Sequence, residues 1–105
     1  MATRSLKNPK KTTIRGYLYC LRMTNGNLSQ RDVAKALGMD YPTYNQIECG
    51  KQGRLMNAEK LYGLAKILNV SVEKVALLEI KYQREIKRAN GVEVEYDPEF
   101  DDVKV

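Results

Sequence analysis

Residues 29–50 (SQRDVAKALGMDYPTYNQIECG) contain two short helical patterns with almost no loop between them. Ser29 and Asp32 have the spacing of a capping box, which predicts that the first helix begins there. Gly38 is typical of a helix end that needs a positive φ, and Asp40 can cap the helix that follows. Because the connection is so short, the two helices must cross steeply, as in a helix-turn-helix.

The second helix of this pair, predicted over residues 41–48, has an unusual composition for a core helix. Tyr44 and Ile47 are expected to point inward, whereas most of the remaining side chains are polar. A helix with a polar outer face is suited to contact something outside its own fold. We therefore expect this face to be a binding surface.

Apolar spacing and capping residues predict three further helices, over residues 13–24, 58–68 and 72–89. The first is capped by Thr12 or Thr13. Its apolar face consists of Ile14, Tyr17, Leu18 and Leu21. Apolar and acidic residues alternate in VEVEY, at 92–96, which indicates a short strand that Pro98 limits. The chain is therefore expected to be all-α, with five helices followed by a short strand or an acidic tail.

Charge is divided unevenly along the chain. The net charge of the whole chain is +5, yet residues 1–90 carry 17 Lys and Arg against 7 Asp and Glu, and residues 91–105 carry one Lys against six acids. A basic body favours a polyanionic partner. The basic arm at 1–12 is either a solubilising terminus or an arm that contacts phosphates or a minor groove. The acidic tail is either a solvated end or a weak competitor of DNA on the basic surface.

Several functional classes lack the residues that they require. The chain has no His and only two cysteines, Cys20 and Cys49, so neither a zinc site nor a cofactor is expected. We expect both thiols to be reduced and buried or half-buried rather than joined in a disulfide. The sequence contains neither a Gly-rich phosphate loop nor a nucleophile–base pattern, so an enzyme is not expected. Without a signal peptide or a membrane-spanning run, a cytoplasmic location is expected.

The runs LSQRDVAKALGM, IECGK and LYGLAKILNVSVEKV resemble the phage-repressor (Cro-like) helix-turn-helix family. The resemblance covers residues 13–79 and implies a five-helix DNA-binding domain of repressor type, followed by a helical extension and acidic tail at 80–105. It implies a sequence-specific regulator of transcription that binds double-stranded DNA, a repressor from a phage, a mobile element or a bacterial operon. Two alternatives stay open. One is an antitoxin that represses its own operon and binds a toxin through its C-terminal part, and the other is a protein-interaction module without DNA contact.

The resemblance also implies roles for individual residues. Gln30 matches a glutamine that grips a phosphate, and Thr43 matches a hydroxyl that contacts phosphate or base. Asn45 lies where it can reach the groove or the backbone. The positions that face base edges are Tyr41, Pro42 and Gln46. Because Lys51 and Arg54 lie in the loop after the third helix, they are expected to contact phosphates that flank the groove.

Glu48 matches an acid that often pairs with an arginine on the first helix, here Arg22, in a structural role. The spacing from Arg22 to Leu28 is one residue longer than in the family. Pro42 has no donor and can offer only apolar contact. Tyr44 occupies a place usually given to Ile or Val, so its ring must be accommodated or its hydroxyl must emerge toward the backbone. The usual Asn before the glycine is replaced by Cys49.

The predicted helix at 72–89 carries apolar residues on more than one face. One face can pack on the first and fourth predicted helices, but Ile80, Tyr82 and Ile86 would be exposed in a monomer. An exposed apolar patch on a basic helix indicates a partner, and a homodimer explains it with the fewest assumptions. The alternative is a helix that is simply longer than the domain.

Overall fold

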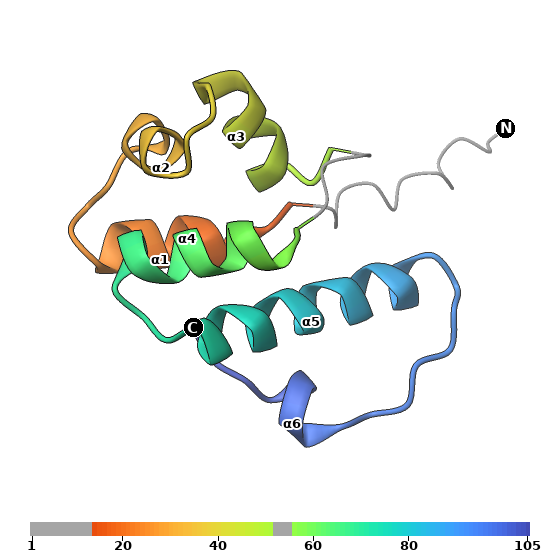
Figure 1. The fold of residues 1–105 in the computed structure, drawn as a ribbon. Coiled ribbons are helices and arrows are strands. Elements are labelled where there is room, and N and C mark those ends of the chain that lie inside the picture. Colours follow the sequence, from red (N-terminus) through yellow and green to blue (C-terminus); the bar gives the residue numbers. More distant parts are fainter. Residues whose placement is uncertain (1–13, 52–55) are drawn as a thin grey trace, which may run out of the picture.

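The computed structural model describes residues 14–51 and 56–105, and within these residues the protein contains six helices and no strand (Figure 1). The helices are α1 (Gly16–Thr24), α2 (Gln30–Ala36), α3 (Tyr41–Glu48), α4 (Ala58–Leu68), α5 (Val72–Ala89) and α6 (Pro98–Asp101). The all-α class and the five predicted helices are confirmed. The short helix α6 has no counterpart in the prediction.

Local hydrogen bonds at the helix starts explain where α2 and α3 begin. The hydroxyl of Ser29 accepts from the N–H of Asp32, and the carboxylate of Asp32 accepts from the N–H of Ser29, both at 3.0 Å. Asp40 caps α3 by accepting from the N–H of Thr43 at 2.9 Å. Gly38, between the two helices, has a φ of +72°, a left-handed conformation that suits glycine. The predicted capping box and tight turn are confirmed.

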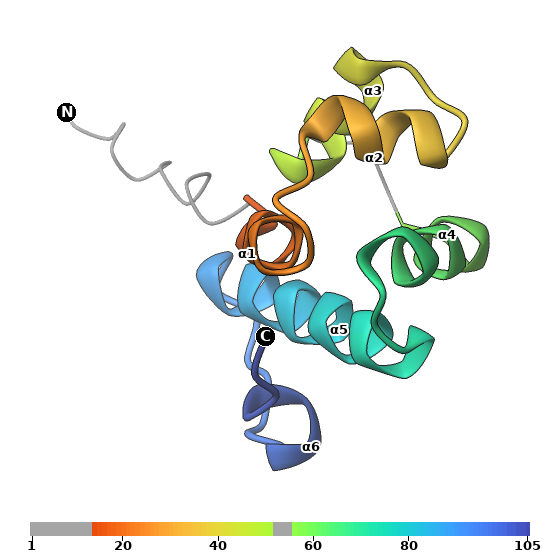
Figure 2. The ribbon, with the colours of Figure 1, turned by 90° about the vertical axis from the view of Figure 1, so that its left-hand side faces the viewer.

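The hydrophobic core includes the buried side of α1, a helix that Figure 2 shows end-on between the α2–α3 pair and α5. One apolar cluster contains the fully buried side chains of Leu18 on α1, Tyr44 on α3, Leu64 on α4 and Val75 on α5. Burying an apolar side chain of this kind contributes roughly 1.5–3 kcal/mol. The core therefore holds α3 along one side only.

The start of α1 differs from the prediction. The helix begins at Gly16, and Ile14 before it is 63% exposed instead of facing the core. The proposed caps Thr12 and Thr13 lie outside the described residues. Arg15 stands immediately before the helix without a capping hydrogen bond from its side chain. The prediction was wrong for Ile14 because the helical periodicity that would turn it inward starts two residues later.

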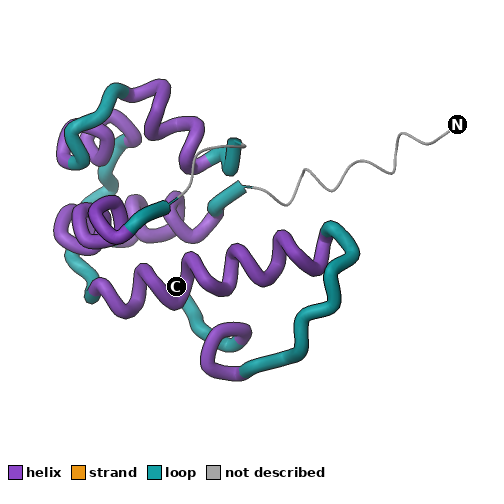
Figure 3. The backbone as a smooth tube through the Cα atoms, turned by 45° about the vertical axis from the view of Figure 1, so that its right-hand side comes forward, coloured by secondary structure: helices purple, strands orange, loops and turns teal. Residues whose placement is uncertain are grey.

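The C-terminal segment also differs, since residues 92–96 form no strand and the chain folds back along α5 (Figure 3). A strand needs a partner edge for its backbone. Here the carbonyl of Val94 instead accepts from the Arg88 side chain at 3.1 Å. On α6, the carboxylate of Asp101 accepts from Arg84 at 2.9 Å and from Arg88 at 3.0 Å. These bonds attach the acidic tail to α5, although most residues of the tail remain exposed to solvent.

The apolar patch predicted on α5 is only partly exposed. Tyr82 belongs to the buried core, and the guanidinium of Arg15 lies 4.6 Å from its ring centroid. Ile86 is half-buried against the same core, whereas Ile80 is exposed. The prediction of exposure was wrong for Tyr82 and Ile86, because the core reaches further along α5 than residue spacing indicates.

Candidate nucleic-acid interface

The two sides of α3 differ in burial. Tyr44, Ile47 and Glu48 are buried, so this side is held against the rest of the fold. The exposed or half-buried positions of the helix are Tyr41, Pro42, Thr43, Asn45 and Gln46. All five predicted contact residues of α3 therefore lie at the surface. Their contact with DNA stays a prediction.

Glu48 holds the inner side of α3 by accepting four hydrogen bonds. Arg22 of α1 donates to its carboxylate from Nε at 2.7 Å and from Nη2 at 3.1 Å. The Tyr44 hydroxyl and the Gln30 amide each donate to it at 2.8 Å. The pairing of Arg22 with Glu48 is confirmed. The ring of Tyr44 is accommodated because its hydroxyl bonds to this buried carboxylate rather than emerging toward the backbone.

The extra residue between Arg22 and Leu28 is absorbed by a folded turn. Gly26 and Asn27 adopt positive φ values of +114° and +54°. The N–H of Leu28 donates to the carbonyl of Arg22 at 3.0 Å, and Nη1 of Arg22 donates to the carbonyl of Leu28 at 2.9 Å. The turn therefore helps to hold the Arg22 guanidinium in place for Glu48.

Two of the donors to Glu48, the Tyr44 hydroxyl and the Arg22 guanidinium, have raised pKa values. Burial raises the pKa of the Tyr44 hydroxyl well above its usual value, and the negative charge of Glu48 raises it further. The hydrogen bond to Glu48 likewise raises the pKa of Arg22. Both donors therefore remain protonated near neutral pH.

Gln30 lies at the seam between α2 and α3 and is half-buried. Its amide nitrogen donates to Glu48, and its amide oxygen accepts from the Asn45 amide at 3.0 Å. Gln30 and Asn45 thus form one hydrogen-bonded pair across the seam. Because the amide nitrogen of Gln30 carries two N–H groups, a phosphate contact by the second would leave both of these bonds in place.

Sequence reasoning missed a second anchor of α3, at Arg15. This side chain donates to Glu79 of α5 from Nε at 2.9 Å and from Nη2 at 3.0 Å, and to the carbonyl of Ile47 from Nη1 at 2.7 Å. The Tyr17 hydroxyl also donates to Glu79, at 2.6 Å. The available signal was the acid within the apolar run VALLEI, since a buried carboxylate needs a donor or a cation.

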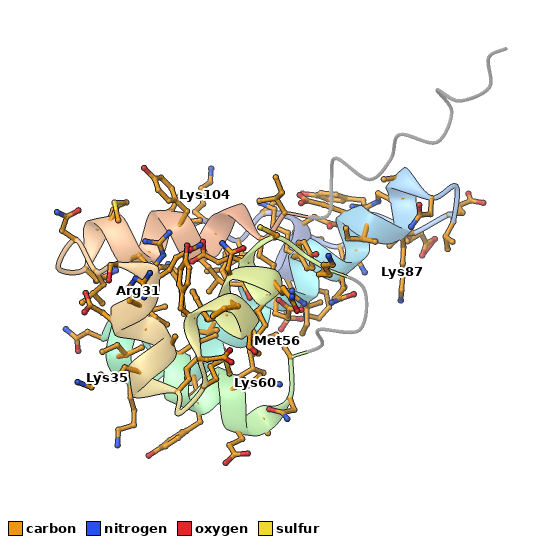
Figure 4. All side chains as sticks on the ribbon, turned by 90° about the horizontal axis from the view of Figure 1, so that it is seen from above. Arg31, Lys35, Met56, Lys60, Lys87 and Lys104 are labelled. Carbon is orange, nitrogen blue, oxygen red and sulfur yellow. The ribbon has the colours of Figure 1, made fainter. Side chains whose placement is uncertain are left out.

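Arg31, on the first turn of α2, was also missed. Its guanidinium carbon lies 4.5 Å from the centroid of the Tyr41 ring at the start of α3. Figure 4 shows Arg31 and Lys35 projecting from α2. Both are exposed. The available signal was the position of Arg31 directly after Gln30, a predicted contact residue.

Lys51 follows α3 and is exposed. Its backbone N–H donates to the carbonyl of Gln46 at 2.9 Å, and Gly50 before it has a φ of +72°. The chain therefore turns sharply at the end of α3. Arg54 and the basic arm lie outside the described residues.

Cys20 and Cys49, which both lie in the described part of the chain, are exposed and form no disulfide. The expected burial was wrong, because Cys20 lies on the outer side of α1 and Cys49 ends α3. Among the described residues, no group of His, Cys, Asp and Glu could hold a metal ion. None of the helices in that part is long and apolar enough to cross a membrane.

Comparison with known proteins identifies the family. A model of the Cro-type helix-turn-helix family matches residues 21–75, which are 55 of the 105 residues. No curated protein and no solved structure gives a significant match. The matched family consists of DNA-binding domains of transcription regulators and is not enzymatic. The chain therefore belongs to the Cro-like helix-turn-helix family and is a DNA-binding regulator of transcription.

Proposed function

We propose that this protein is a sequence-specific repressor that lays α3 in the major groove of its operator. One observation carries the proposal: Glu48 and its partners hold the inner side of α3, while Tyr41 and Gln46 stay at its surface. A helix that reads base edges must be fixed in position and open on its outer face.

Base reading falls to the surface residues of α3. The amide of Gln46 can bond bidentately to N6 and N7 of an adenine. Tyr41 offers its ring and its hydroxyl at the start of the helix. Pro42 has no N–H and offers apolar contact, for which the methyl group of thymine is the matching partner. Asn45 borders these residues beside Gln30.

Phosphate contacts position the protein on the duplex without reading its sequence. Thr43 near the start of α3 and Lys51 directly after it flank the proposed reading residues. Arg54 continues the same loop in the sequence. Gln30 joins this group by donating the second N–H of its amide nitrogen to a phosphate oxygen, while the first N–H stays bonded to Glu48.

The proposal includes a homodimer. A cytoplasmic location is consistent with the proposed binding of an operator. Val72 and Ile80, eight residues apart on one side of α5, are 41% and 39% exposed. Two copies joined through this strip would carry two copies of α3 into successive major grooves. Half-sites should then lie about 10–10.5 bp apart, or a multiple of that distance.

Selection from random duplex DNA tests the proposal. The salt concentration should be about 150 mM, where non-specific binding is weak. An enriched inverted repeat supports sequence-specific binding and gives the half-site spacing. An enriched single site supports base reading but contradicts the proposed homodimer. No enrichment, with binding that vanishes as salt rises, would refute base reading and favour a protein-interaction module.

Gln46→Ala should weaken binding to the selected site by about 1–3 kcal/mol and relax the preference at one base position, because a bidentate base contact is lost. The measurement is titration of the variant on the selected site and on single-base variants of it. An equal loss on every sequence would show that Gln46 does not read a base.

Lys51→Ala should weaken binding to every sequence alike and reduce the slope of affinity against salt by about one, because one phosphate contact is lost. Lys87→Ala is the matched control, since this exposed lysine lies on α5 away from α2 and α3 (Figure 4). A salt slope that is unchanged in Lys51→Ala would remove this residue from the phosphate contacts.

A further inference from the structure

Arg31 differs from the other arginines that the structure describes. Four of the five form ion pairs or bidentate hydrogen bonds with carboxylates, namely Arg15 with Glu79, Arg22 with Glu48, and Arg84 and Arg88 with Asp101. Within the described residues, Arg31 has no carboxylate at salt-bridge distance and instead stacks on the ring of Tyr41, at 4.5 Å. It is exposed, so its charge and its N–H groups remain available at the surface.

The stack lies at the start of α3, beside the seam between α2 and α3. Gln30, the residue before Arg31, bonds to Asn45 on α3. Tyr41 and Asn45 are four residues apart and so lie on the same side of α3. The first turn of α2 therefore runs along one side of α3. This arrangement brings the Arg31 guanidinium to the end of α3 that a helix-turn-helix protein directs at base edges.

The chemistry of a stacked guanidinium suits one base in particular. The Arg31 guanidinium lies over the ring of Tyr41, and because Arg31 is exposed its N–H groups can reach a partner outside the fold. An arginine edge matches the O6 and N7 acceptors of guanine in the major groove. Stacking also restricts the side chain before binding, so less conformational freedom is lost when its hydrogen bonds form.

We infer that Arg31 and Tyr41 form one reading unit, in which Arg31 selects a guanine at the base pair nearest to the start of α3. This inference rests on the proposed function and extends it by a residue of α2. Tyr41 then has two roles, since it offers its own ring and hydroxyl to the bases and also orients Arg31.

Selection from random DNA with a set of variants tests the inference. The wild-type protein should enrich a guanine at one position of each half-site. Arg31→Ala and Arg31→Lys should both lose that preference by roughly 10-fold or more, because lysine keeps the charge but not the planar fork. Tyr41→Phe keeps the ring and should retain the guanine, whereas Tyr41→Ala should weaken the preference. Lys35→Ala, at the exposed lysine one turn further along α2, should change no preference.

Three results would overturn the inference. If Arg31→Ala weakens all sequences equally, lowers the salt slope by about one and is rescued by Arg31→Lys, the residue contacts a phosphate. If Arg31→Ala leaves both affinity and motif unchanged, the residue has no part in binding. If the wild-type protein enriches no motif, the proposed function fails and the inference with it. The first two results leave the proposed function intact, so the two failures are distinguishable. Thermal unfolding of each variant controls for loss of the fold.

Discussion

Replacing Glu48 is expected to remove a large part of the folding stability of this protein. Glu48 is 7% exposed and Arg22 is 6% exposed, so the loss of the carboxylate leaves a guanidinium unpaired where little water reaches. Breaking a buried ion pair by removing one partner costs about 3–5 kcal/mol. Because a domain usually has a free energy of unfolding of about 5–15 kcal/mol, a loss of this size would leave the fold marginal.

A double-mutant cycle separates pairing from packing. Glu48→Met and Arg22→Met keep most of the side-chain volume, but each leaves one partner uncompensated, so each should cost about 3–5 kcal/mol. The double variant buries neither charge. It should cost no more than either single variant, since apolar residues of similar volume can replace a buried ion pair at little cost. Urea unfolding followed by far-ultraviolet circular dichroism measures all four free energies.

Either of two results would refute this reasoning. A loss below about 1 kcal/mol in Glu48→Met would mean that solvent screens the pair as it does at a surface. Losses that add in the double variant would mean that packing, not pairing, carries the effect. Arg88→Met is the matched control, because Arg88 pairs with Asp101 in a more exposed place and its loss should cost much less.

Two further perturbations address the turn and the C-terminal segment. Gly38→Ala should cost about 1–2 kcal/mol in urea unfolding, because alanine resists the φ of +72° there, and Gly38→Asn should cost less; equal stability of all three proteins would show that the turn relaxes. Asp101→Asn should release α6, seen as faster amide hydrogen exchange at 99–102 with unchanged exchange in α1 to α4; unchanged exchange at 99–102 would contradict this. Hydrogen bonds from Arg84 and then Arg88 hold the pKa of Asp101 well below its usual range, so its contribution is present above the ordinary carboxyl pKa. The contribution declines as pH falls below the ordinary carboxyl pKa and is lost as pH falls through the lowered pKa, so the protection of α6 in the wild-type protein, relative to the intrinsic exchange rate at each pH, should decrease in acid.

The starts of α2 to α5 were predictable from sequence because their causes are local. Ser29, Asp40, Asn57 and Ser71 each accept a hydrogen bond from the N–H three residues later. Such a bond depends on a short stretch of chain and hardly on the rest of the fold. The surface position of the residues on α3 that we propose to read bases followed from the same local pattern, which turns Tyr44 and Ile47 inward.

Contacts between distant residues were not predictable. Arg15 and Glu79 are 64 positions apart, and spacing within one helix does not reveal such a pair. The alternation in residues 92–96 is compatible with a strand, but it contains no information about whether a partner edge exists. The stack of Arg31 on Tyr41 depends on the crossing of two helices, which single-sequence patterns indicate only in outline.

Two buried arginines, Arg15 directly before α1 and Arg22 on α1, have a mechanical consequence. Arg15 joins the C-terminal end of α3 to α5, and Arg22 seven residues later joins α3 through Glu48. Both attachments hold the C-terminal end of α3, at Ile47 and Glu48, so they resist movement of α3 relative to α1 and α5. If α3 keeps its angle to α1 and α5 when it docks on a duplex, any bending needed for a close fit must come from the nucleic acid. Operators with flexible pyrimidine–purine steps at base pairs that the protein does not touch would then be bound more tightly than stiff ones.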